Sequence, residues 1–207
     1  FLFVQLVLVA ICFFILLSKG VYESPEMALD KAVFQAVSIS TTAGFTTTSF
    51  QDWPLFLPVL LVFSSFIGGC AGSTGGGMKV VRILLLYLQG MREMKRLVHP
   101  RAVYKIKLGK KVLPDRVIDA VWGFFSAYAL VFVICMLALI ATGMDELSAF
   151  SAVVATLNNL GPGLGQVAVH FGDVNDSAKW ILVVAMLFGR LEVFTLLILF
   201  TPAFWRS

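Results

Sequence analysis

Two short loops carry backbone carbonyl groups that could replace the water around a cation. The first glycine loop is Thr42-Ala43-Gly44-Phe45, and the second glycine loop is Asn159-Leu160-Gly161-Pro162. Carbonyl oxygens that point into a pore can coordinate a dehydrated cation, and glycine permits the backbone angles that such a loop needs. Taken singly, either glycine could equally do no more than end a short helix.

A short helix is predicted before each glycine loop. The segments are residues 26–40, introduced by Ser24-Pro25, and residues 145–157. Fifteen residues of helix reach only ~22 Å, because the rise is about 1.5 Å per residue, whereas a span takes about 20 residues. Each helix is therefore expected to enter the membrane and return as a loop. Its C-terminal end would carry about −0.5 charge and favour a cation just beyond it.

Longer apolar segments enclose each helix and loop. Residues 1–18 and 115–142 are predicted spans before the helices, and further spans begin at Trp53-Pro54 and at Lys179-Trp180. The same order therefore occurs twice in one orientation, with Gly44 and Gly161 separated by 117 residues. This repetition favours a shared cation pathway over simple helix termination. The predicted division is a pore repeat (1–92), a basic cytoplasmic connector (93–114) and a second pore repeat (115–207).

Composition and charge indicate an integral membrane protein. The 207 residues are 59% hydrophobic and 14% charged, with a mean hydropathy of +0.92, whereas soluble domains carry about 25% charged residues. Eleven of the sixteen Lys and Arg lie in residues 79–116, whereas residues 20–52 and 143–179 hold eight acids. The positive-inside rule places the basic segment in the cytoplasm. Its position between hydrophobic hairpins favours contact with anionic lipid over nucleic acid.

A glycine-rich stretch interrupts the span that follows the first loop. This glycine-rich break, residues 68–77, contains Gly68, Gly69, Gly72, Ser73, Thr74, Gly75, Gly76 and Gly77. Each glycine costs a helix roughly 1 kcal/mol relative to alanine, so the helix is expected to stop and restart. The stretch is no phosphate-binding loop, because Met78 separates Gly77 from Lys79 and no Gly-Lys-Ser/Thr follows. Close helix packing is the alternative reading.

Arg190 is a charge deep in the last predicted span. An arginine at the bilayer centre costs at least ~2.5–3.5 kcal/mol on insertion scales. Glu192, two residues on, points to a different helix face. Carbonyls freed by the glycine-rich break could accept hydrogen bonds from Arg190, so we expect this side chain to hold the break in place. The partner of Glu192 stays open.

Four segments together resemble a known family of transporters. Residues 42–45, 68–79, 159–163 and 189–192 are similar to the last two repeats of the Trk/Ktr/HKT potassium-transporter superfamily, most closely its bacterial TrkH-type membrane subunits. The resemblance covers essentially the whole chain. It implies an all-α integral membrane fold of tandem parallel repeats, each a span, a re-entrant pore helix with its filter loop, and a second span. The family carries four such repeats around one pore, and this chain would supply the third and fourth.

The resemblance also implies a function. K⁺ would pass the cytoplasmic (inner) membrane through a filter of backbone carbonyls that includes Gly44 and Gly161, with the glycine-rich break as a gate below it. A sodium-selective or sodium-coupled relative is the alternative, and passive flow and symport both stay open. Asn159 departs from the Thr-x-Gly pattern of the first loop, which fits a weaker filter.

The partners implied by the resemblance are the N-terminal half of the same chain, a second copy in a homodimer, and cytosolic nucleotide-binding regulatory subunits. The lipid bilayer surrounds the chain, no cofactor is expected, and K⁺ is the cargo. Enzyme activity is not expected, because only Arg190 and Glu192 are charged near the membrane interior.

Overall fold

The computed structural model describes residues 1–70, 72–73, 75–102, 104–109 and 111–190. The expectations for Thr74, for Glu192 and for the end of the last span lie outside these residues. The described elements are, in order, α1 (Leu2–Ser18), α2 (Pro25–Ser40), η1 (Phe50–Asp52), α3 (Leu57–Ser64), α4 (Val80–Val98), β1 (Lys107–Leu108), β2 (Lys111–Val112), α5 (Asp115–Ala141), α6 (Glu146–Leu157), η2 (Gly165–Val167) and α7 (Asp176–Arg190).

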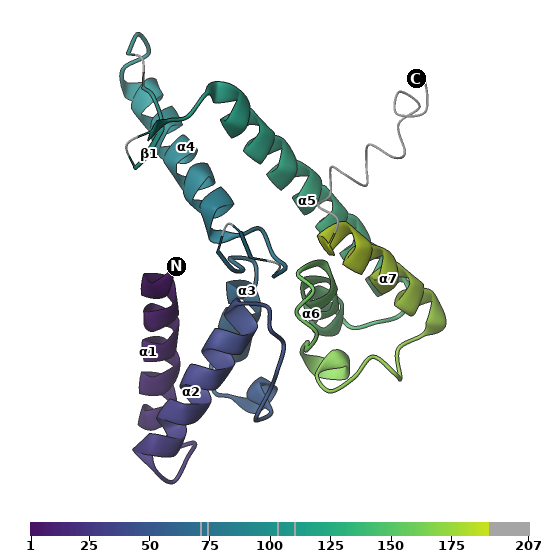
Figure 1. Ribbon diagram of the computed structural model, residues 1–207. Coiled ribbons are helices and arrows are strands. Elements are labelled where there is room, and N and C mark those ends of the chain that lie inside the picture. Colours follow the sequence, from purple (N-terminus) through teal and green to yellow (C-terminus); the bar gives the residue numbers. More distant parts are fainter. Residues whose placement is uncertain (71, 74, 103, 110, 191–207) are drawn as a thin grey trace.

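Six of the seven described α-helices form two groups, each with its own hydrophobic core, and α4 packs against α5 around a third cluster (Figure 1). In the first group, α1 and α3 pack against α2, whose Ala28, Ala32 and Ala36 are buried at a four-residue spacing. In the second group, α5 and α7 pack against α6. Val154 and Leu160 of the second group enter the first core, so the end of α6 and its loop join the two groups.

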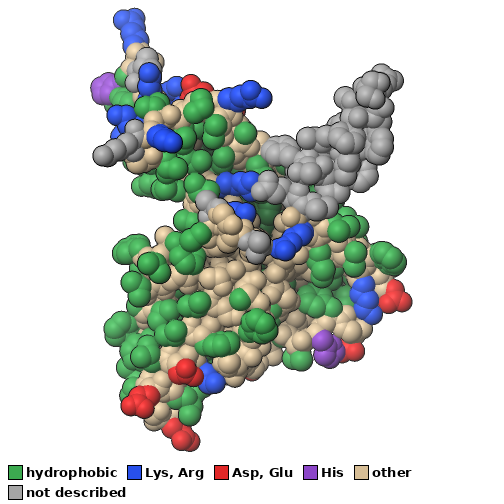
Figure 2. Space-filling view, viewed as in Figure 1, with side chains coloured by type: hydrophobic (Ala, Val, Ile, Leu, Met, Phe, Trp, Pro, Cys, Tyr) green, Lys and Arg blue, Asp and Glu red, His purple; other side chains and the backbone are tan. Residues whose placement is uncertain are grey.

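Helix α5 is long and apolar enough to cross a membrane. It has 27 residues, and only 22% of its most apolar window is buried within the described chain. Exposed side chains such as Leu130 and Leu137, each 61% accessible, suit contact with hydrocarbon. Helix α1 is shorter, with 17 residues. Lys and Arg gather at the end formed by α4 and the β1–β2 hairpin, and acids lie at the opposite end (Figure 2).

The interruption of the inner helix is real but longer than predicted. Helix α3 ends at Ser64 and α4 begins only at Val80. The hydroxyls of Ser64 and Ser65 donate to the Leu61 and Val62 carbonyls, both at 2.6 Å. Such side-chain bonds compete with helix continuation, so the helix stops before the first glycine.

Two further boundaries differ from the prediction. Helix α3 begins at Leu57 and not at Trp53-Pro54, because η1 and a turn with Leu55 at φ +60° come first. Helix α4 continues to Val98, past the predicted boundary at 92/93. Its extension is stabilised by Arg92, whose guanidinium lies 2.7 Å from Asp115 at the start of α5. The connector also contains the antiparallel β1–β2 hairpin, which the sequence analysis did not predict.

Candidate functional site

The two glycine loops leave their helices with the same backbone conformation. Helix α2 ends at Ser40 and α6 at Leu157, and two residues later Thr42 and Asn159 have φ values of +59° and +52°. Left-handed angles are uncommon for residues other than glycine. Their occurrence at equivalent positions shows that the two chain reversals are built alike.

Hydrogen bonds repeat this match. The Ala43 amide donates to the Ser38 carbonyl at 2.8 Å, and the Leu160 amide donates to the Ala155 carbonyl at 2.7 Å. Each bond spans five residues, as in the Schellman motif that closes many helices. The donors are 117 residues apart, and so are the acceptors. The two loops therefore share this backbone hydrogen bond at positions with the spacing of Gly44 and Gly161.

The loops touch each other. A Cβ atom at Gly44 would overlap the Leu160 carbonyl oxygen and would lie 3.5 Å from Pro162 Cδ, whereas a Cβ at Gly161 would meet nothing within 4 Å. Both glycines have positive φ, +80° and +106°. Gly44 is thus needed for clearance as well as for its backbone angle.

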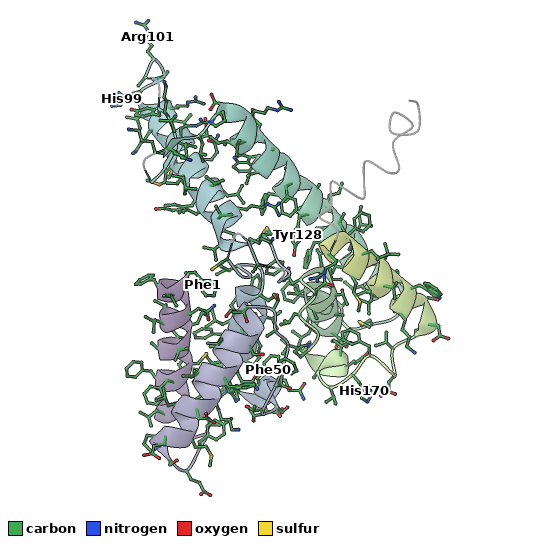
Figure 3. The ribbon with its side chains drawn as sticks, viewed as in Figure 1. Phe1, Phe50, His99, Arg101, Tyr128 and His170 are labelled. Carbon is green, nitrogen blue, oxygen red and sulfur yellow. The ribbon has the colours of Figure 1, made fainter. Side chains whose placement is uncertain are left out.

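A cavity of about 670 Å³ opens between the loops. Gly44, Asn159, Leu160, Gly161 and Pro162 line it together with residues that follow the loops. It lies at the end of the molecule where Figure 3 shows Phe50 and His170. Five of the eight predicted loop residues thus line one cavity, and Thr42 and Ala43 form the turn that leads to Gly44.

An N-cap fixes the start of each short helix. Ser24 accepts a hydrogen bond from the Met27 amide at 3.2 Å, as the sequence predicted, and Asp145 accepts one from the Ser148 amide at 3.0 Å. The Ser148 amide bond, followed by a bond from the Ser148 hydroxyl, lowers the pKa of Asp145. A carboxylate there also offsets the positive end of the helix dipole.

The glycine-rich break lies directly against the ends of both short helices. The Gly76 amide donates to the Thr42 hydroxyl at 2.9 Å in a buried position, and a Cβ at Gly76 would overlap the Asn158 carbonyl oxygen. A Cβ at Gly75 would lie 3.2 Å from both the Thr41 carbonyl oxygen and the Thr42 hydroxyl. The break therefore lies on the side of the glycine loops opposite the large cavity.

Backbone contacts close the base of the break. The Met78 amide donates to the Phe66 carbonyl at 3.0 Å, and the Val80 amide donates to the Gly69 carbonyl at 3.3 Å. Gly68 and Gly77 have φ values of +64° and +73°, angles that suit glycine. The break is thus a folded loop with its two limbs held together, and Gly72 lies in open space.

Arg190 lines a cavity together with residues of the break. A cavity of about 200 Å³ is lined by Ser73, Gly75, Gly76 and Gly77 on one side and by Arg190 on another. Lys79 and Arg82 line it too, and the Arg82 guanidinium lies 4.2 Å from the centre of the Phe124 ring. Lys79 and Arg82 were expected only as cytoplasmic charges, and their place beside the break was not predicted.

Asn158 is a central residue that the sequence analysis did not select. Its side chain is fully buried, donates to the Ser65 hydroxyl at 2.8 Å and accepts from the Tyr128 hydroxyl at 2.5 Å. It thereby joins the end of α6 to the last turn of α3 and to α5, where Figure 3 shows Tyr128 near the middle of the molecule. An asparagine after an apolar helix signals a cap, but its partners lie 93 and 30 residues away.

These features define a helical membrane transport protein: a membrane-length helix, two matched loops rich in carbonyls, and a folded break behind them. The family model described as TrkH, cation transport protein, matches residues 1–207, and the chain belongs to this family. The resemblance inferred from the four segments is thereby confirmed.

Relatives and a solved structure give the extent of the match. The Trk system potassium uptake protein TrkH of Vibrio parahaemolyticus is 78% identical over the whole chain, and that of Escherichia coli K12 is 68% identical over the whole chain. The crystal structure of the potassium transporter TrkH from V. parahaemolyticus matches 99% of the chain with a TM-score of 0.93. The chain spans 43% of each of these relatives and 44% of the crystallised chain.

Proposed function

We propose that this chain is the part of a potassium uptake protein that supplies two pore repeats, the third and fourth of four, in the bacterial cytoplasmic membrane. The observation that carries the proposal is the match between the two glycine loops in backbone angles and hydrogen bonds. The loops also meet each other, at Gly44 and the Leu160 carbonyl. The relatives are named as potassium uptake proteins, which favours K⁺ over the sodium alternative.

The electrostatics of the site suit a cation. Helices α2 and α6 end beside the same space, and each C-terminus carries about −0.5 charge. Loop carbonyls can then replace the water that the ion loses. The loops 42–45 and 159–162 supply the proposed carbonyl ligands, and the rest of the ring would come from the other repeats of the full-length protein.

The glycine-rich break acts as a gate on the inner side of this filter. Its Gly76 N–H points at the Thr42 hydroxyl, so a hydrogen-bond donor occupies the place where a cation leaving the filter would need an acceptor. Arg190, Lys79 and Arg82 add positive charge around the adjoining cavity. An ion can pass only when the break moves away from the ends of α2 and α6.

The basic end of the molecule gives the orientation and a surface for partners. Residues 79–116 would lie in the cytoplasm. The cytosolic nucleotide-binding subunits implied by the family resemblance would meet the protein on that side, and a homodimer is proposed on the same ground.

Rubidium uptake by the full-length protein in proteoliposomes tests the function. Gly44→Ala should abolish uptake or its preference for K⁺ over Na⁺, because the added Cβ meets the Leu160 carbonyl. Gly20→Ala is the matched control, since Gly20 also has positive φ, +59°, but lies in open space. Absence of uptake by the unaltered protein, or equal behaviour of the two variants, would refute the proposal.

Arg190→Ala tests the gate. Loss of the fixed positive charge should raise rubidium flux, and Arg101→Ala, which removes an exposed charge at the far basic end (Figure 3), should not. Unchanged flux in a folded Arg190→Ala protein would contradict a gating role for this side chain.

A further inference from the structure

Two side chains of α2 form hydrogen bonds with the segment that begins at Phe45, directly after Gly44 of the first glycine loop. The Ser38 hydroxyl donates to the Phe45 carbonyl at 2.6 Å, and Gln35 Nε2 donates to the Thr48 carbonyl at 2.8 Å. Both side chains are buried, with exposures of 7% and 0%. The donors are three residues apart on one helix face, and the acceptors are three residues apart along the loop. Helix α2 therefore holds this segment at two points.

The second half fastens its loop differently. The positions equivalent to Gln35 and Ser38, 117 residues on, are Ala152 and Ala155, which carry no hydrogen-bonding side chain. Helix α6 instead uses Ser151, which accepts from the Leu164 amide at 2.9 Å. This anchor lies three residues beyond Gly161, and within the described chain the Pro162 carbonyl accepts no hydrogen bond.

The second half thus holds its loop without a polar side chain at these positions. Gln35 also carries a cost, because its Oε1 atom is buried without a partner in the described chain. A buried polar atom without a partner costs about 1–3 kcal/mol. A donor retained at Gln35 is therefore explained better by what it does to the loop than by packing alone.

The first loop thus has one carbonyl fewer to offer an ion. A carbonyl oxygen that accepts a short hydrogen bond from α2 directs electron density toward the helix, and Phe45 is the residue next to Gly44. We propose that Ser38, with Gln35 beside it, determines the ion preference of the pathway by holding the Phe45 carbonyl away from the ion. The inference rests on the proposed function. Preference between K⁺ and Na⁺ depends on the number and strength of coordinating carbonyls, so fewer ligands weaken discrimination.

The test measures how K⁺ and Na⁺ compete with rubidium uptake by the full-length protein in proteoliposomes. Ser38→Ala should raise the K⁺ over Na⁺ preference by about five-fold, the equivalent of one hydrogen bond. Ser38→Thr keeps the hydroxyl and should retain the original ratio. Ser126→Ala is the control, because Ser126 is an exposed hydroxyl on α5 that bonds only within its own helix.

A second variant guards against loss of folding. Gln35→Leu removes the donor at similar volume and should shift the same ratio in the same direction. The inference would be overturned if Ser38→Ala or Gln35→Leu carries flux with an unchanged K⁺ over Na⁺ ratio. It would also be overturned if Ser38→Thr shifts this ratio as much as Ser38→Ala does. The proposed function would stand in either case. Absence of rubidium uptake by both the unaltered protein and Ser126→Ala would instead overturn the proposed function itself.

Discussion

Replacement of Gly76 by alanine should open the glycine-rich break. The new Cβ atom would overlap the Asn158 carbonyl oxygen, and real Cβ atoms essentially never approach within 3.0 Å of another heavy atom. The Gly76 amide also holds the Thr42 hydroxyl at 2.9 Å. Either the break or the end of α6 must therefore move, and we expect the break to move because α5 and α7 both pack against α6.

The size of the effect follows from the clash. Overpacking costs about 1–3 kcal/mol. If that cost falls on the closed arrangement alone, the ratio of open to closed protein rises by about 5- to 150-fold. Rubidium flux through the full-length protein should rise accordingly. Gly72→Ala is the control within the same segment, because a Cβ there would meet nothing within 4 Å, and its flux should stay unchanged.

A native thiol reports where the movement occurs. Cys70 lies in the break and is exposed, whereas Cys12 and Cys135 are buried. Modification by a water-soluble thiol reagent should become faster in Gly76→Ala and should disappear when Cys70 is changed to serine. Lower flux with unchanged Cys70 reactivity would mean that the second glycine loop had moved instead, and the reasoning would fail.

Two further predictions concern the positioning of these elements. Arg92→Ala should destabilise the protein by about 1–3 kcal/mol, because the buried Arg92 guanidinium bonds Asp115 and so joins α4 to α5. The control Arg96→Ala removes a half-exposed charge and should cost under about 1 kcal/mol. Thermal unfolding of the two variants in detergent measures the difference. The Asp145 carboxylate has a lowered pKa, so its contribution to stability is present above the ordinary value of 3.8 and is lost as pH falls through the lowered pKa. Asp145→Asn keeps an acceptor for the Ser148 amide but does not titrate, so its unfolding midpoint should show a weaker dependence on acid pH than that of the unaltered protein.

The local signals in the sequence predicted most of the helices. Ser24-Pro25 marks the start of α2, apolar length marks α5, and the paired glycines mark the two chain reversals, because each of these depends on residues close together in the chain. The ends of the inner-helix interruption were less accurate. Ser64 and Ser65 end α3 through hydrogen bonds to the carbonyls three residues earlier. The apolar residues before them favour a longer helix, so composition does not show where the helix ends.

Contacts between residues far apart in the chain could not be predicted from the sequence. Nothing in the order of residues shows that the Asn158 amide meets Ser65, or that the Gly76 amide meets Thr42, since each pair depends on how α3, α6 and the break pack. The expectation for Arg190 rested on the small number of places open to a charge in a membrane, and its part in the gate stays a prediction. Lys79 and Arg82 were missed because they also fit the basic segment.

Glycine has two separate uses in this site, and they predict different responses to alanine. Gly161 has a positive φ with open space around it, so an added methyl group there strains only the backbone. Gly76 and Gly189 have ordinary φ values, but a Cβ would overlap the carbonyl oxygens of Asn158 and Leu157 respectively. These two glycines let the break and α7 approach the end of α6 from two sides. Backbone therefore meets the end of that helix directly at these two glycines, which is why a single methyl group at Gly76 should act on the gate.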